Sequence, residues 1–160
     1  MLKASAGMDT GYIVPTTLSE VRQLFPGIER HGVLMFPEEP PKCRRCKTRP
    51  ILQSNDTDNS IRRPYYSCIK PRCGHFRMYA DHRGNDPTNP KCSCGSPSRR
   101  MIAGHWRSYE EEYPSNIGHV YYTCRFGDCT YKELHKTPEG HYVIINDWGL
   151  VDALEKLYIV

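Results

Sequence analysis

The residues of this sequence best suited to chemistry are its cysteines, which number eight and fall into two groups of four. Each group is an opening pair separated by one or two residues, followed by a closing pair separated by four. The groups are Cys43, Cys46, Cys68 and Cys73, and then Cys92, Cys94, Cys124 and Cys129. Zinc prefers tetrahedral thiolate coordination, and two pairs on two turns can meet around one ion. The spacing therefore predicts two Zn²⁺ ions, each held by four cysteines.

Zinc sites of this kind stabilise a fold and perform no catalysis, because four thiolates leave no open position for a reactive water. The sequence also shows no nucleophile elbow, no phosphate-binding glycine loop and no ligand set with an open position. We therefore expect a binding protein and not an enzyme. One alternative stays open at this stage: the cysteines pair as disulfides in a secreted protein whose signal peptide has been removed.

The two cysteine groups belong to an internal repeat. A Pro-Lys-Cys sequence at 41–43 recurs at 90–92, and a Tyr-Tyr sequence precedes both Cys68 and Cys124. The stretch between the two copies consists of polar turn formers, which predicts a short linker. The predicted boundaries are a first unit at 42–83, the linker at 84–90 and a second unit at 91–136.

The N-terminal flank, residues 1–41, carries a helical pattern that the repeats lack. Thr17 and Glu20 form a capping-box pattern, and the apolar residues of 18–25 then fall on one helical face. The apolar run at 32–36 predicts a strand.

The C-terminal flank, residues 137–160, begins with the turn signal Thr-Pro-Glu-Gly at 137–140. An apolar strand at 142–145 follows, and Asn146 or Asp147 is placed to cap a final amphipathic helix. Cysteine-rich units below about 40 residues rarely fold without a metal or cross-links. We expect both flanks to supply apolar cover for the units.

Charge is spread unevenly along the chain. The formal net charge is +4, yet the first unit alone holds eleven Lys/Arg against three Asp/Glu, a net +8. The second unit is near +2, the linker −1, and the N- and C-terminal flanks −2 and −3. A basic island of this kind favours a polyanionic partner such as nucleic acid.

The sequence contains no run near the ~18 apolar residues that a membrane-spanning helix needs. Its N-terminus, MLKASAGMDTGYIVP, has no apolar stretch of the kind found in secretory signals. We expect a nuclear or cytoplasmic protein without membrane contact, in a compartment where paired cysteines bind metal.

The second unit resembles the GRF zinc finger. The sequence CSCG at 92–95 matches that family's opening, and NIGHVYYTC at 116–124 matches its Asn-x-Gly-Arg-x-Phe-Tyr-x-Cys segment, with His119 at the arginine position. In the first unit Arg63, the two tyrosines and Cys68 fit, although this unit opens with Cys-x2-Cys. The tryptophan usual after the last cysteine is absent from both units.

This resemblance implies a small, mainly β, zinc-stabilised fold with two short twisted antiparallel sheets. We expect the N-terminal and C-terminal helices to pack on them and fix their relative orientation. GRF fingers accompany DNA repair and processing enzymes, where they look like modules that bind single-stranded DNA.

Single-strand binding requires positive charge along the phosphates and aromatic faces for the bases. Because side chains alternate along a strand, one tyrosine of each Tyr-Tyr pair belongs in the core, and we assign Tyr65 and Tyr121 outward. The predicted contacts from both units are Arg62, Arg63, Tyr65, Lys70, Arg72, Arg77, Arg99, Arg100, Tyr121 and Arg125.

The function predicted from the sequence is zinc-dependent nucleic-acid binding, with single-stranded DNA preferred and RNA open. The alternative is a protein–protein interaction module in which the zinc fingers are scaffolds and the acidic flanks dock a partner.

Overall fold

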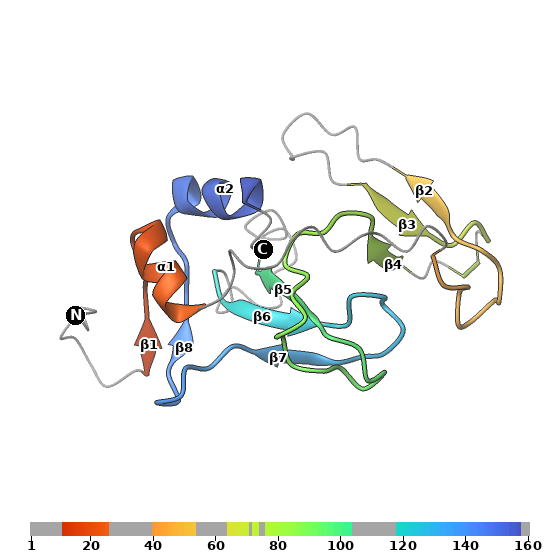
Figure 1. The fold of residues 1–160 in the computed structure, drawn as a ribbon. Coiled ribbons are helices and arrows are strands. Elements are labelled where there is room, and N and C mark those ends of the chain that lie inside the picture. Colours follow the sequence, from red (N-terminus) through yellow and green to blue (C-terminus); the bar gives the residue numbers. More distant parts are fainter. Residues whose placement is uncertain are drawn as a thin grey trace.

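The molecule contains two similar three-stranded sheets, one made of β2, β3 and β4 and the other of β5, β6 and β7 (Figure 1). The structure is a computed structural model that describes residues 11–25, 40–53, 64–70, 72–73, 76–103 and 118–157. Within these residues the chain is mainly β, with short antiparallel sheets and few helices, as the sequence predicted.

Each unit contributes one antiparallel sheet with the same strand order. The first unit has the order β2 (Ile51–Gln53), β3 (Tyr65–Ser67) and β4 (Phe76–Tyr79). The second unit has the order β5 (Arg99–Ile102), β6 (Val120–Thr123) and β7 (Lys132–Leu134). In both, the Tyr-Tyr sequence lies on the central strand, so the internal repeat is a repeat of structure.

The two helices begin where the sequence predicted. In α1 (Leu18–Leu24), the Thr17 hydroxyl accepts a hydrogen bond from the Glu20 backbone N–H, and the Glu20 carboxylate accepts one from the Thr17 N–H. In α2 (Trp148–Lys156), the Leu150 N–H donates to the Asp147 carboxylate, which therefore caps the helix. Neither of these described helices is long and apolar enough to cross a bilayer.

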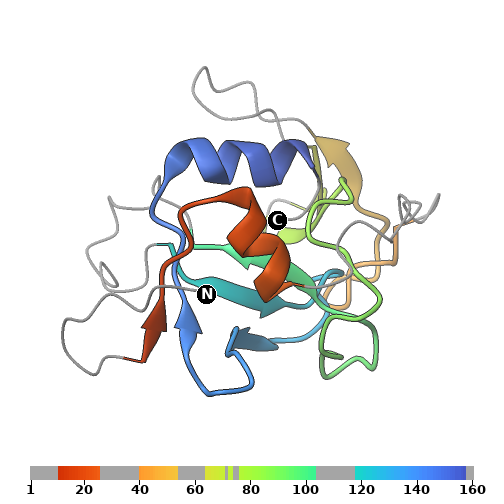
Figure 2. The ribbon, with the colours of Figure 1, turned by 60° about the vertical axis from the view of Figure 1, so that its left-hand side comes forward.

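The core lies between the helices and the second unit. Apolar residues of α1, α2, β6 and the C-terminal flank form it: Val21, Phe25, Val120, Val143, Ile145, Leu150, Val151 and Leu154. Figures 1 and 2 show both helices on the same side of the second unit's strands. The flanks thus cover one face of the second unit, and this described core cluster includes no residue of the first unit.

The two flanks also meet in a parallel pair formed by β1 (Tyr12–Ile13) and β8 (Tyr142–Val143). The predicted turn at 137–140 is present, with the Thr137 N–H donating to the His141 carbonyl at 2.9 Å. Across this turn Lys136 forms a bridge with Tyr142, and β8 pairs along its other edge with β1. The strand predicted at 32–36 lies outside the described residues.

The segment predicted as a linker, 84–90, packs against the start of β5. Asn89 is buried, and its side-chain amide donates to the carbonyls of Gly84 and Ser98 at 2.8 Å each. Gly84 has a φ of 70°, and a Cβ there would lie 2.0 Å from the Arg100 carbonyl oxygen. This close approach requires glycine.

Candidate metal centres and nucleic-acid interface

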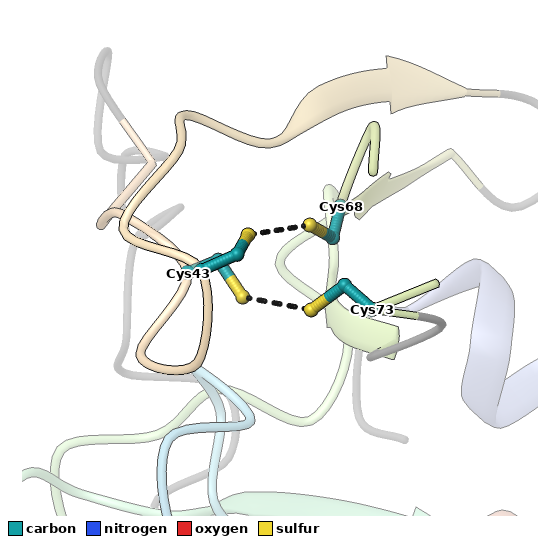
Figure 3. Close-up of side chains that lie close together, drawn as sticks. Cys43, Cys68 and Cys73 are labelled. Atoms are coloured by element: carbon teal, nitrogen blue, oxygen red, sulfur yellow. Dashed lines mark hydrogen bonds between the residues drawn. The ribbon is translucent and has the colours of Figure 1, made fainter. Parts of the chain in front are cut away.

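The first cysteine group closes around a point between two turns. Cys43 and Cys46 lie on the opening turn, and Figure 3 shows Cys68 and Cys73 facing that turn. The Cys43 and Cys73 sulfurs are 3.6 Å apart, and the Cys46 and Cys68 sulfurs 3.0 Å. All four sulfurs lie within 4.8 Å of one another.

The second group, Cys92, Cys94, Cys124 and Cys129, gathers in the same way, with its sulfurs also within 4.8 Å. Around one Zn²⁺ ion with Zn–S bonds of about 2.3 Å, tetrahedral sulfurs lie about 3.8 Å apart. All eight cysteines are free thiols, so the disulfide alternative is not supported. Both groups therefore fit the predicted zinc ions in donor set and spacing.

The opening turns share a backbone feature. Lys47 and Gly95, each directly after the second cysteine of its pair, have left-handed φ values of 59° and 78°. Glycine adopts this conformation without strain, whereas lysine does not. The left-handed turn therefore explains the glycine of the Cys-x-Cys-Gly opening. In the first unit Lys47 adopts the same conformation with some backbone strain.

Hydrogen bonds to the sulfurs shift the pKa values of the cysteine thiols. Bonds from the side chains of Cys68 and Thr48 lower the pKa of Cys46 to about 6. The bond between Cys94 and the Cys129 sulfur raises the pKa of Cys94 to about 12. Zinc coordinates thiolates, so its binding displaces the protons of the thiols that it ligates. Metal affinity should therefore rise with pH.

The described segments that carry the zinc-binding cysteines of the first unit have basic side chains and no acidic ones. These segments, 40–53, 64–70 and 72–73, contain no Asp or Glu. Lys70 and Arg72, both predicted contacts, are exposed. The exposed cations, which we call the basic surface, are Lys42, Arg44, Arg45, Lys47, Arg49, Lys70 and Arg72.

The tyrosines of β3 do not differ in burial class, so the outward assignment of Tyr65 stays a prediction. Tyr65 and Tyr66 are both half-buried, and the Tyr65 hydroxyl donates to the Gln53 side chain at 2.8 Å. On β6 the alternation does hold, since Tyr122 is buried and Tyr121 is half-buried. The Lys132 ammonium lies 4.9 Å from the Tyr121 ring centroid.

Arg99, predicted to contact nucleic acid, is instead buried between the two units and is 1% exposed. Its guanidinium donates to the Asp81 carboxylate at 2.7 Å and to the carbonyls of Asp81, Tyr79 and Arg83 at 2.9, 3.1 and 3.2 Å. Its acceptors follow or end the last strand of the first unit. Arg99 therefore joins the units, a role that the sequence analysis gave to the helices.

Arg100 is also buried, at 4% exposure, which corrects its predicted role as a contact. It donates to the Asn89 side chain at 2.9 Å and lies 3.8 Å from the Asp86 carboxylate. Its guanidinium carbon is 4.5 Å from the Phe25 ring centroid. Arg100 thus connects the predicted linker, β5 and helix α1.

Arg125 is half-buried in the closing turn of the second unit, 4.5 Å from the ring centroid of Phe126. In the same turn the Asp128 carbonyl accepts a hydrogen bond from Arg44 of the first unit at 2.7 Å. The zinc turns of the two units therefore meet. The remaining predicted contacts, Arg62, Arg63 and the side chain of Arg77, lie outside the described residues.

Comparisons with known proteins found a likeness among solved structures only. A scan against protein-family models and a search of curated proteins gave no match. Among solved structures, the tandem zinc finger GRF domains of human NEIL3 match 61% of this chain and all of that chain, with 22% identity and a TM-score of 0.25. A likeness at this level establishes nothing about function by itself.

Proposed function

We propose that this protein is a zinc-dependent nucleic-acid binding protein that prefers single strands and catalyses no reaction. The observation that carries the proposal is the basic surface, whose exposed cations lie in described segments of the first unit that contain no Asp or Glu. Tyr65 and Tyr66 lie on β3, directly before Cys68 of that site. Cations beside aromatic rings are what single-strand binding needs.

The zinc sites shape this surface as well as stabilising it. A Zn²⁺ ion held by four thiolates carries a net charge of about −2. The seven cations of the basic surface exceed that charge, so the first unit stays positive when zinc is bound. In the described part of the second unit, where Arg99 and Arg100 are buried, the exposed cations are Lys91, Lys132 and Lys136. The first unit should therefore supply most of the phosphate contacts.

The test is a fluorescence-anisotropy titration of zinc-loaded protein with labelled single-stranded DNA, duplex DNA and single-stranded RNA, over a salt series. We expect binding to the single strand whose log affinity falls linearly with log salt. The variant Lys70→Gln/Arg72→Gln removes two exposed cations and should reduce the slope by about 1.4. Arg22→Gln, on the exposed side of α1, is the matched control and should bind like wild type.

Zinc dependence is tested in the same assay. Chelation should abolish binding together with the folded structure, and added Zn²⁺ should restore both. Folded, zinc-loaded protein that binds none of the three nucleic acids at low salt would refute the proposal. The exposed side chains of Ile51 and Leu52 on edge strand β2 would then favour protein docking on a zinc-finger scaffold.

A further inference from the structure

Aromatic rings gather on the face of the second unit that points away from the helices. Tyr122 of β6 packs toward α1, so alternation along the strand places His119 and Tyr121 on the opposite face. Tyr12 of β1 and Tyr142 of β8 come from the two flanks and meet on this face beside His119. Residues far apart in the sequence thus form one surface.

The rings of the flanks lie over a buried histidine. The Tyr12 centroid is 5.8 Å from that of Tyr142 and 5.7 Å from that of His119. His119 is only 4% exposed, whereas Tyr12 is 44% exposed. Within the described residues, the buried Nδ1 of His119 has no hydrogen-bond partner. The cluster therefore presents one accessible ring, that of Tyr12, above a buried histidine.

Two exposed lysines border these rings. The Lys136 ammonium is 4.9 Å from the Tyr142 ring centroid, and the Lys132 ammonium is at the same distance from that of Tyr121. Both lysines therefore place a cation beside an aromatic ring on this surface. The acidic Glu139, at the tip of the 137–140 turn, lies between Lys136 and His141 in the sequence.

We propose that Tyr12, Tyr121, Lys132, Lys136 and Tyr142 form a second contact site for single-stranded nucleic acid, here called the tyrosine–lysine platform. Bases stack on Tyr12 and Tyr142, and the two lysines contact the neighbouring phosphates. This inference rests on the proposed function and extends it, because it assigns a binding role to both flanks. A strand would then contact charge on the first unit and stack its bases on the tyrosines of the two flanks.

The alternative to a binding role is a structural one, in which the tyrosines only stabilise the pairing of β1 with β8. Three variants separate the two roles. Tyr12→Leu removes the exposed ring and should weaken single-strand binding at least about fivefold, the lower end of what one stacked base contributes. Tyr12→Phe keeps the ring and should bind within about twofold of wild type. Lys136→Gln changes an exposed side chain and should weaken binding with an unchanged melting temperature.

The salt dependence gives a second readout. Tyr12→Leu should leave the slope of log affinity against log salt unchanged, because stacking displaces no counterions, whereas Lys136→Gln should lower it by about 0.7. If Tyr12 had only a structural role, Tyr12→Leu and Lys136→Gln would not differ in this way in their salt dependence. If Tyr12→Leu unfolds, Lys136→Gln and the cross-linking below decide.

Photo-cross-linking of wild-type protein to a strand carrying 5-bromouracil locates the bases directly. We expect adducts on Tyr12 or Tyr142. Adducts confined to 64–73, with Tyr12→Leu and Lys136→Gln binding like wild type, would overturn the platform while the proposed function stands. If wild-type protein binds no strand, the proposed function fails and the platform fails with it.

Discussion

Removal of the Arg99 side chain should loosen the junction between the two units while both zinc sites remain. Arg99→Met keeps much of the side chain's length but deletes the guanidinium. The four hydrogen bonds of 2.7–3.2 Å described above end on Tyr79, Asp81 or Arg83. No cysteine sulfur is among these acceptors. The variant should therefore still bind two zinc ions per chain.

The expected loss of stability follows from the charge of Asp81, which stays buried when the guanidinium is deleted. Removing one partner of a buried ion pair costs about 3–5 kcal/mol, because the other charge stays buried. Asp81 keeps a hydrogen bond from the Arg83 N–H at 3.2 Å and the Arg83 side chain at 4.0 Å. We therefore expect about 3 kcal/mol for Arg99→Met. Arg99→Lys keeps the charge but cannot reach every acceptor of the planar fork, and should cost about 1–2 kcal/mol.

The assay is urea unfolding at fixed excess free Zn²⁺, so that metal linkage is the same for each protein. Zinc content is measured in parallel. Arg72→Met is the control, since this arginine is exposed and its replacement should change stability by less than about 0.5 kcal/mol. A loss below about 1 kcal/mol for Arg99→Met, or one equal to that of Arg72→Met, would refute the reasoning that Arg99 holds the units together.

Two further predictions concern the surroundings of Arg100. Burial, together with the nearby charge of Arg100, lowers the pKa of His135 to about 4. Because the unfolded ring binds its proton near pH 6.5, the wild type should lose stability relative to His135→Gln as pH falls from 7.5 to 5, by about 1 kcal/mol after discounting for partial solvent access. A difference in unfolding free energy that stays constant over this range would contradict the assignment. Gly84→Ala should cost about 3 kcal/mol or more, because its Cβ would collide with the Arg100 carbonyl. Gly140→Ala, with a φ of 88° and open space around it, isolates the backbone strain and should cost about 1 kcal/mol; equal losses for the two glycines in urea unfolding would show that the collision is relieved.

Features encoded by local spacing were predicted from the sequence. The four cysteines of each unit sit on turns whose spacing brings sulfurs together, and the capping box at Thr17 and Glu20 involves neighbouring residues only. The inward placement of Tyr122 follows from strand alternation. Such patterns need no knowledge of the rest of the chain.

Features that depend on distant partners were not predicted. Arg99 and Arg100 look like surface cations in the sequence, and only their acceptors, Asp81 and Asn89, reveal that they are buried. The difference in burial between the two tyrosines of β6 is absent from β3, where Tyr65 and Tyr66 are both half-buried. The basic residues outside the described ranges stay predictions.

The charges of the chain also argue for a division of labour between the units. Two four-thiolate zinc sites, at about −2 each, offset the formal net charge of +4, so net charge alone gives no attraction to a polyanion. Attraction must therefore come from an uneven distribution of charge. Among the described residues, most of the exposed cations belong to the first unit. The second unit buries Arg99 and Arg100 to fix the junction and the core, and the flanks that pack on it carry the stacking rings of the proposed platform. In the proposed binding mode, a rigid junction at Arg99 sets the distance between the basic surface, which would attract the phosphates, and the platform, which would stack the bases.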